Sequence, residues 1–578
     1  MREESNTKRQ LCEQAIQHDE LVQSFEFDCN TKETQTDMVF EEKSVTKIDV
    51  GVQCNIEIQE PFHIPLTSSG TGESDNQSSD EFSESEDESP IDPSEKPSKA
   101  AFIVYWTSLL ILLERCLFPA CVLSSAVTSI IYKGSQLIVT MKCQGGHTMT
   151  WNSQPNCNHY SVGNLVGAAS VLFSANTYQR IASFFELANI QWLSKTSYYA
   201  IQKKYLTGVV NKTFIEKSAE MFNDIKMRGI YSLSGDGRCD SPGHNAKYLT
   251  YSFLDRVTNK VIAFSLVQVT EAGNSNRMEK MGFTKTLNHL KNNGIIPTQI
   301  TTDRHSQIRK YMREEEPEIE HQFDIWHFAK NIKQRLIAAS KKTSCKIIEK
   351  WIRSIGNHLW WACATCEGDS ELLREKWISV LFHIQNKHKW TGCKKFIKCQ
   401  HPRLTKKQIK AKEWISPKSE AFEALQKIVL DAKVLKDLNY LNKFCHTGVL
   451  EVYHSLYNKW APKRQHFSYQ GMLARSQLAI MDFNQGSNLE QAKTRKGEDK
   501  YKVQFSKITK TWSSKPVKKQ KDRTFLQDMV KETVKFATEK KYPEKPATPS
   551  LPSNIASTPK PNKVDVIKNQ LSRFGNKK

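Results

Sequence analysis

A run of strand patterns between Gly229 and Thr302 constrains the fold of this chain more than any other feature. Four segments alternate apolar and polar residues or are rich in β-branched and aromatic side chains, and one segment has helical spacing. The order is strand 229–235, strand 247–255, strand 261–269, helix 276–292 and strand 296–302. This order predicts a mixed sheet in which the first and fourth strands lie side by side.

An aspartate stands at the end of each of these two strands. Asp236 is flanked by Gly235 and Gly237, and Asp303 is followed by Arg304 and His305. If the strands are neighbours, the two carboxylates converge on a point where a divalent cation can bind, and the glycines let a ligand approach the backbone closely. The alternative is that each aspartate only caps a turn or a helix.

A third carboxylate is expected from a later part of the chain. A short strand at 319–323 completes a pattern that is typical of mixed sheets of the ribonuclease H type, and residues 328–445 have the character of a helical insertion. The chain then returns in a helix that Thr447 or Gly448 caps and that carries Glu451. Two-metal phosphoryl transfer needs three or four carboxylates around cations roughly 3.5–4 Å apart. We therefore expect Mg²⁺ or Mn²⁺ to be bound by Asp236, Asp303 and Glu451.

The expected fold class is α+β, mixed: a ribonuclease H-like mixed sheet with a helical insertion, a mainly helical N-terminal region and disordered termini. The expected segments are a disordered acidic segment (1–98), a mainly helical region with a small zinc hairpin (99–225), the first part of the catalytic core (226–340), the insertion (341–440), the second part of the core with the Glu-bearing helix (441–500) and a basic, mostly disordered tail (501–578).

Charge is unevenly distributed along the chain. The net charge is +21, yet residues 1–98 carry 7 basic and 24 acidic side chains, so residues 99–578 carry a surplus of +38. A surplus of this size favours a polyanionic partner, most simply double-stranded DNA. The apolar segment 101–113 is too short for a bilayer, which needs roughly 20 residues, so we expect a buried helix there and no membrane association.

Fourteen cysteines without an apolar leader at the N-terminus favour reduced thiols and metal binding over disulfides. Two groups have spacings that zinc tolerates. The first is Cys116, Cys121, Cys143 and His147. The second lies in the insertion and is drawn from Cys363, Cys366, His383, His388, Cys399 and His401, of which we expect Cys366, His383, Cys399 and His401 to be the ligands. For both groups the alternative is buried free thiols.

Four longer strings resemble the transposases of Kolobok-type DNA transposons. They are Ser234–Tyr248, Thr302–His305, Asp324–His327 and His446–Ser455, and the resemblance runs from about Phe102 to Trp512. It implies a DDE enzyme that cuts and joins DNA, with Asp236, Asp303 and Glu451 as the catalytic carboxylates. It also implies that Asp324 and His327 lie near the active site, together with Arg304 and His305, and that the protein is a homo-oligomer.

One departure from that family concerns DNA-end recognition. Relatives often carry an N-terminal zinc-coordinating THAP module, but residues 1–98 offer only Cys12, Cys29 and Cys54, which are too widely spaced for it. The chain is therefore expected to be either a transposase-like enzyme or a domesticated, non-catalytic DNA-binding or scaffold protein derived from one. The intact acidic triad favours the enzyme.

Short motifs indicate one further partner and a cellular location. The segments 32–37 and 50–55 resemble peptides that add an edge strand to the dynein light chain dimer, through Lys32, Thr34, Gln35, Thr36, Val52 and Gln53. A basic cluster resembles a nuclear import signal and predicts a nuclear protein. Its residues are Lys515, Lys518, Lys519, Lys521 and Arg523.

Overall fold

The computed structural model describes residues 101–242, 245–401, 403–506, 510–550, 559 and 561–569. The acidic segment 1–98, its light-chain motifs and its cysteines lie outside the described residues. The chain divides into two units, Met1–Leu109 and Leu110–Lys578. No helix in the described ranges combines the length and the apolar character needed to cross a bilayer.

A helix does form in the apolar segment 101–113, but the expectation that it is buried is wrong. Helix α2 (Trp106–Leu113) buries only Leu113. Ile111 and Leu112 are about two-thirds exposed, at 67% and 66%. Its apolar residues therefore do not belong to a core within the described residues.

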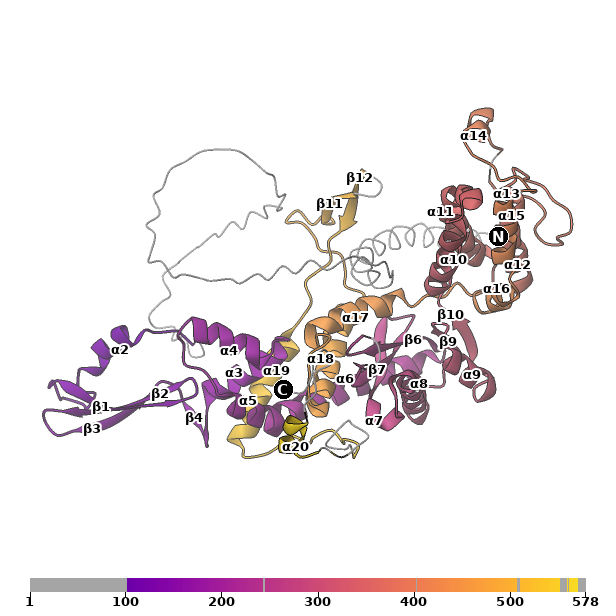
Figure 1. Ribbon diagram of the computed structural model, residues 1–578. Coiled ribbons are helices and arrows are strands. Elements are labelled where there is room, and N and C mark those ends of the chain that lie inside the picture. Colours follow the sequence, from indigo (N-terminus) through magenta and orange to yellow (C-terminus); the bar gives the residue numbers. More distant parts are fainter. Residues whose placement is uncertain are drawn as a thin grey trace. The chain divides into compact units, whose positions relative to one another are not determined.

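The region after α2 contains more sheet than the sequence suggests. Strands β1 (Ser125–Lys133), β2 (Gln136–Cys143) and β3 (Thr148–Asn152) form an antiparallel sheet in the order β1-β2-β3 (Figure 1). Gly134 makes the β1–β2 turn with a φ of 64°, which favours glycine. The β-branched run in β1 explains why strands form where a small hairpin was expected. A short pair, β4 (Asn156–Cys157) and β5 (Tyr160–Ser161), follows.

Helices then lead to the central sheet. They are α3 (Val162–Phe173), α4 (Tyr178–Leu187), α5 (Lys195–Ile201), a π-helical turn at Gln202–Leu206 and α6 (Thr207–Arg228). Gly229 ends α6 in the left-handed conformation, with a φ of 73°, as is common for a residue that follows a helix.

The central sheet has five strands in the order β10-β9-β6-β7-β8. They are β6 (Ser232–Cys239), β7 (Tyr248–Asp255), β8 (Lys260–Gln268), β9 (Gln299–Thr302) and β10 (Glu320–Phe323). Strands β6, β7 and β8 pair antiparallel, whereas β9 pairs in parallel with both β6 and β10. The mixed α+β fold class is therefore confirmed, and the first and fourth strands are neighbours as expected.

Helices on both sides of this sheet complete its core. Helix α8 (Ser275–Asn292) packs on β7 and β8, where Phe283 stacks edge-on against Tyr251 and Phe253 with ring centroids 5.5 Å apart. Helix α17 (Gly448–Trp460) contacts β6, and α18 (Tyr469–Gln485) contacts β8 and α6. The short helices α7 (Val269–Ala272) and α9 (Ser306–Glu314) connect strands to these layers.

The segment between β10 and α17 is helical and has a hydrophobic core of its own (Figure 1). Its elements are α10 (Ile325–Ser340), a 3₁₀ stretch (Thr343–Trp351), α11 (Ile352–Thr365), α12 (Ser370–Ile378), α13 (Val380–His383), α14 (Lys406–Lys410), α15 (Glu420–Val429) and α16 (Ala432–Asp437). Trp377 and Leu425 are fully buried in that core. We call residues 325–445 the insertion.

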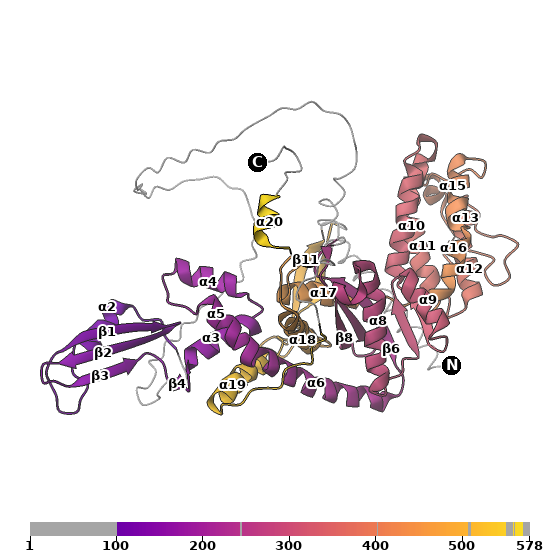
Figure 2. The ribbon, with the colours of Figure 1, turned by 60° about the horizontal axis from the view of Figure 1, so that its bottom comes forward.

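The basic tail is more ordered than its composition suggests, so the expectation of a mostly disordered tail is wrong for much of it. Strands β11 (Tyr501–Ser506) and β12 (Thr511–Pro516) form a hairpin, and two helices follow, α19 (Thr524–Thr538) and α20 (Lys563–Lys568). Helix α19 packs against α3 and α6 (Figure 2). Its buried residues recur every four positions, which makes one face apolar despite the basic composition: Phe525, Met529, Thr533 and Ala537.

Met529→Ala is expected to lower the free energy of unfolding by about 2–4 kcal/mol, because Met529 is only 1% exposed and its loss leaves a cavity between α19 and its neighbours. Lys531→Ala, at an exposed position of the same helix, is the control and is expected to change stability by less than about 0.5 kcal/mol. Urea denaturation of the full chain measures both, and equal effects would contradict the packing of α19.

A buried histidine in the insertion predicts a pH dependence. Burial lowers the pKa of His358 to about 4, and its Nε2 lies 2.6 Å from the carbonyl of Lys376. The unfolded chain protonates this histidine near pH 6.5. Between pH 6.5 and 4 the unfolded state therefore binds more protons, and the free energy of unfolding falls as the pH falls, by about 3 kcal/mol over the whole window. His358→Gln keeps a side-chain N–H donor and removes the titration. Its unfolding free energy, measured in urea at pH 7.5 and pH 4, is expected to fall less than that of the wild type, and an equal fall would contradict the assignment.

Candidate active site

Strand pairing brings the two aspartates together. The parallel ladder between β6 and β9 ends with Ser234 opposite Thr301, so two residues further along Asp236 lies level with Asp303. Asp236 accepts a hydrogen bond from the backbone N–H of Gly237 at 2.8 Å. Burial and the negative charge of Asp236 raise the pKa of Asp303. The aspartates thus lie within each other's electrostatic field at one edge of the sheet.

A close approach of β6 at this point requires a glycine. A Cβ atom at Gly235 would lie 2.6 Å from the ring of Phe253 and 2.7 Å from the hydroxyl of Tyr251. The absence of a side chain lets the aromatic layer of β7 pack directly beneath Asp236.

Glu451 joins the site because the insertion begins and ends at the same place. The backbone N–H of Ile325, where the insertion starts, donates to the carbonyl of Cys445, where it ends, at 3.2 Å. The hydroxyl of Thr447 donates to Oδ2 of Asp324, which is only 1% exposed. Helix α17 starts one residue later, so Glu451 lies in its first turn beside β6.

Asp324 and His327 lie in the same region. Asp324 caps α10 by accepting from the N–H of Trp326 at 2.8 Å. Nε2 of His327 is 3.8 Å from Oδ2 of Asp324 and 3.9 Å from Oε1 of Glu451. The histidine therefore bridges the cap of α10 and the carboxylate of α17.

The carboxylates differ in their tendency to ionise. Burial raises the pKa of Glu451 to about 6. The negative charges of Asp324 and Asp236 raise this pKa further, and the charge of His327 lowers it. At Asp236 burial also opposes ionisation, but the hydrogen bond and charge of His454 outweigh it and lower the pKa. Nδ1 of His454 lies 3.4 Å from Oδ2 of Asp236. The site thus concentrates buried negative charge that a divalent cation would neutralise.

Sequence reasoning missed two residues of this site. Glu279 of α8 has a pKa raised to about 8 by burial and by the charges of Asp303 and Asp236. The second is His454, which stands one turn after Glu451 on α17 and therefore on the same face. A signal for Glu279 exists in the sequence, because it stands beside the core-facing positions Met278 and Gly282 of an amphipathic helix.

The two residues that follow Asp303 point to different neighbours. Arg304 forms an ion pair with the buried carboxylate of Asp437 in α16, to which Arg309 also binds at 2.9 Å. His305 donates its backbone N–H to Asp303 at 3.0 Å, and its Nε2 lies 3.8 Å from Glu279. The end of β9 is thereby fastened to the insertion on one side and to α8 on the other.

The acidic residues are grouped less tightly than the Cys/His clusters. Within the described part of the chain, two sets of ligand atoms lie all within 4.8 Å of one another, and both consist of cysteine and histidine. Asp236, Asp303 and Glu451 are not such a set; they interact through charge over longer distances. They could hold cations jointly as an open site of hard oxygen ligands, which suits Mg²⁺ and Mn²⁺.

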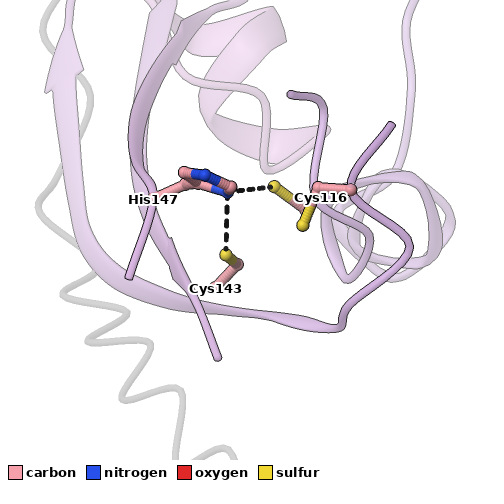
Figure 3. A group of neighbouring side chains, drawn as sticks. Cys116, Cys143 and His147 are labelled. Carbon is pink, nitrogen blue, oxygen red and sulfur yellow. Dashed lines mark hydrogen bonds between the residues drawn. The ribbon is translucent and has the colours of Figure 1, made fainter. Parts of the chain in front are cut away.

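The first Cys/His cluster lies at the turn of the β2–β3 hairpin, where Cys143 and His147 meet Cys116 and Cys121 from the segment before β1 (Figure 3). Nδ1 of His147 lies 3.4 Å from Sγ of Cys143 and 3.7 Å from Sγ of Cys116, and Cys121 completes the set. Tetrahedral zinc with Zn–S near 2.3 Å and Zn–N near 2.0–2.1 Å separates its ligand atoms by about 3.3–3.8 Å. Desolvation opposes ionisation of Cys143, but backbone N–H groups of His147 and Gly145 and the neighbouring thiols hold its pKa at about 7. The residues therefore fit a zinc ion.

The second cluster differs from the expected set by one residue. Its members are His383, His388, Cys399 and His401. Cys366 is not among them, because helix α11 directs it into the core of the insertion, where its thiol donates to the carbonyls of Cys363 and Asn442. The expectation that Cys366 binds the metal is therefore wrong, and both thiols of its Cys-x-x-Cys pair with Cys363 are buried in that core.

Comparison with known proteins gives a match over part of the chain. Residues 268–399 match the family model described as Mutator-like transposase. This part of the chain is similar to Mutator-like transposases. The match includes Glu279, Asp303, Asp324 and His327, and it does not reach Asp236 or Glu451. No curated protein matches the chain.

Thr447→Val is expected to lower the free energy of unfolding by about 2 kcal/mol, because it leaves the buried carboxylate of Asp324 without its hydroxyl donor. Thr447→Ser keeps the hydroxyl and is expected to stay within about 1 kcal/mol of the wild type. Urea denaturation distinguishes them, and a valine variant as stable as the serine variant would contradict this contact.

Proposed function

We propose that this chain is a DNA-cleaving and strand-joining protein of the Kolobok type of transposase, with a ribonuclease H-like catalytic core. The observation that carries the proposal is the pairing of β6 with β9, which sets Asp236 level with Asp303 while α17 presents Glu451 beside β6. Support also comes from the transposase match over residues 268–399 and from the surplus of basic residues after residue 98.

In this proposal Asp236, Asp303 and Glu451 hold divalent cations, Mg²⁺ or Mn²⁺, and Glu279, whose pKa the charges of Asp303 and Asp236 raise, adds negative charge to the site once cations are bound. Bound cations supply charge neutralisation and a lowered pKa of water at a phosphodiester. The chain's own contribution is to orient the carboxylates: His454 keeps Asp236 ionised, and His327 lies against Glu451. The 3′-hydroxyl freed by cleavage is then the nucleophile for strand joining, so no covalent enzyme intermediate is required.

The proposed nuclear location rests on the basic cluster at 515–523. Lys515 lies in β12 and is exposed. Lys519 pairs with Glu490 at 2.7 Å, and Lys521 and Arg523 lie 3.6 and 3.5 Å from Asp482. Binding of an import receptor would therefore compete with these ion pairs. Oligomerisation and light-chain binding stay predictions, the latter resting on residues outside the described ranges.

A second candidate is a non-catalytic DNA-binding or scaffold protein derived from a transposase, which the surplus of basic residues after residue 98 fits equally well. Both candidates are expected to bind DNA, and only the first is expected to cleave and join it.

Asp303→Asn is expected to abolish cleavage of a DNA duplex in Mg²⁺, with a loss of at least about 100-fold, because it removes a charged ligand of the cation. Glu451→Gln is expected to act similarly, whereas Glu413→Gln, at an exposed position of the insertion, leaves activity unchanged. Gel analysis of cleaved and joined products from the full chain measures these effects. If the wild type cleaves DNA no faster than Asp303→Asn, the proposal of an enzyme is overturned and the non-catalytic scaffold remains as the candidate function.

A further inference from the structure

The second Cys/His cluster has the dimensions of a metal site. Nδ1 of His383 lies 3.5 Å from Sγ of Cys399, within the about 3.3–3.8 Å that tetrahedral zinc imposes. The three imidazole rings stand edge to face, with centroids 4.9–5.2 Å apart: His383, His388 and His401. All four ligand atoms lie within 4.8 Å of one another.

The backbone builds this cluster from both ends of a small hairpin. Helix α13 ends at His383, and Lys389 then forms an isolated antiparallel bridge with Lys398. At the base of this hairpin the N–H of Cys399 donates to the carbonyl of His388 at 3.0 Å. Two ligands are thus brought together by the hairpin, and a third by the helix that precedes it.

One ligand atom is buried without a partner. Nε2 of His388 lies 3.1 Å from the amide oxygen of Asn386, whereas Nδ1 of His388 is buried and has no hydrogen-bond partner. Such an atom costs free energy unless something binds it. An imidazole with one nitrogen hydrogen-bonded and the other directed at a cation is the usual arrangement of a metal ligand.

Aromatic side chains shield the cluster. The rings of Trp351 and Trp414 lie 6.0–6.1 Å from those of His383 and His388. Within the described residues, the three partly buried members of the cluster, His383, His388 and Cys399, form no ion pair with a carboxylate, and His401 is exposed. Zinc is the metal that this set of nitrogen and sulfur ligands favours.

The segment that the cluster organises is strongly basic. Residues 384–418 contain eleven lysines and arginines and one acidic residue, Glu413. Lys395 is neutralised by Asp369 and Glu371. Exposed lysines without an ion pair within the described residues surround the hairpin: Lys387, Lys389, Lys394 and Lys398. Three backbone N–H groups, of Lys394, Lys395 and Phe396, hold the hairpin on the carboxylate of Glu375, each at 2.7 Å.

We propose that His383, His388, Cys399 and His401 bind one Zn²⁺ and that this ion holds the lysine-rich hairpin 388–399 in a shape that contacts the phosphates of double-stranded DNA. The zinc site does not depend on the proposed function, whereas the choice of DNA as the partner of the lysines rests on the proposed function.

The zinc content of the purified full chain tests the metal site. The wild type is expected to hold two zinc ions per chain by elemental analysis, one in each cluster, and Cys399→Ala and His388→Ala one fewer. Cys366→Ala and Cys393→Ala are the matched controls and are expected to hold two. His388→Cys replaces one zinc ligand with another and is expected to retain both ions, which separates loss of a ligand from loss of folding. Unchanged zinc in Cys399→Ala, or equal loss in Cys366→Ala, would overturn the proposal.

Cobalt gives a second readout, which reports thiolate coordination directly. The first cluster has three thiols and the second has one. In a Cys116→Ala/Cys121→Ala/Cys143→Ala background, where every thiol of the first cluster is removed, Co²⁺ is expected to give a single-thiolate charge-transfer band. That band is expected to disappear when Cys399→Ala is added. Its persistence there would exclude Cys399 as a ligand.

Salt-dependent DNA binding tests the role of the hairpin. Replacing Lys387, Lys389 and Lys398 by alanine is expected to reduce the slope of log affinity against log salt by about 3, as measured by anisotropy with a fluorescent random-sequence duplex. The same replacement of Lys531, Lys535 and Lys540, exposed on or just after α19, is the control with an equal change of charge. Cys399→Ala is expected to lose slope like the hairpin variant, while Asp303→Asn keeps the wild-type slope and zinc. An unchanged slope in the hairpin variant would overturn the DNA contact, independently of whether the chain cleaves DNA.

Discussion

The closure of the insertion at its two ends is the contact on which the candidate site depends. The hydrogen bond from Ile325 to Cys445 and the bond from Thr447 to Asp324 return the chain to its point of departure. Because the ends are joined there, an insertion with its own core can be accommodated without separating β6 from α17. A long excursion costs little extra closure entropy once its ends are fixed by such contacts. The insertion therefore separates Glu451 from Asp303 in the sequence but not in the fold.

Mutual repulsion among carboxylates is the second constraint. Burial and the charge of Asp236 raise the pKa of Asp303, Glu451 and Glu279, whereas the hydrogen bond and charge of His454 hold the pKa of Asp236 itself below its usual value. Groups of like charge in a shared site are costly unless protons or cations compensate them. Repulsion between these carboxylates lowers the stability of the fold when no cation is bound. A bound cation would relieve that repulsion, and this relief would contribute to its affinity. Active sites commonly lose stability for the sake of function in this way.

Much of the sheet could be predicted from the sequence because its strands have local signals. Alternation and β-branched residues mark β6, β7 and β8, and the neighbourhood of β6 and β9 follows from the order of the elements. Glu279 and His454 were missed because their role depends on which face of α8 and α17 meets the sheet. Cys366 was misassigned because Cys-x-x-Cys spacing does not reveal that α11 turns both thiols inward. Helix α19 was missed because lysines and nearby prolines concealed its four-residue apolar repeat.

The contact of α19 with α3 and α6 joins segments that lie far apart in the sequence, on either side of the central sheet strands and the insertion. Asn158 donates to the carbonyl of Ala537 at 2.6 Å, and Cys157 lies 3.0 Å from the hydroxyl of Thr538. These contacts link residues more than 370 positions apart. During synthesis α3 and α6 keep an apolar face uncovered until α19, at Thr524–Thr538, has been made. This module can therefore be completed only after the segments that carry the candidate site have been made, and a product truncated before α19 would expose a surface that chaperones and proteases recognise.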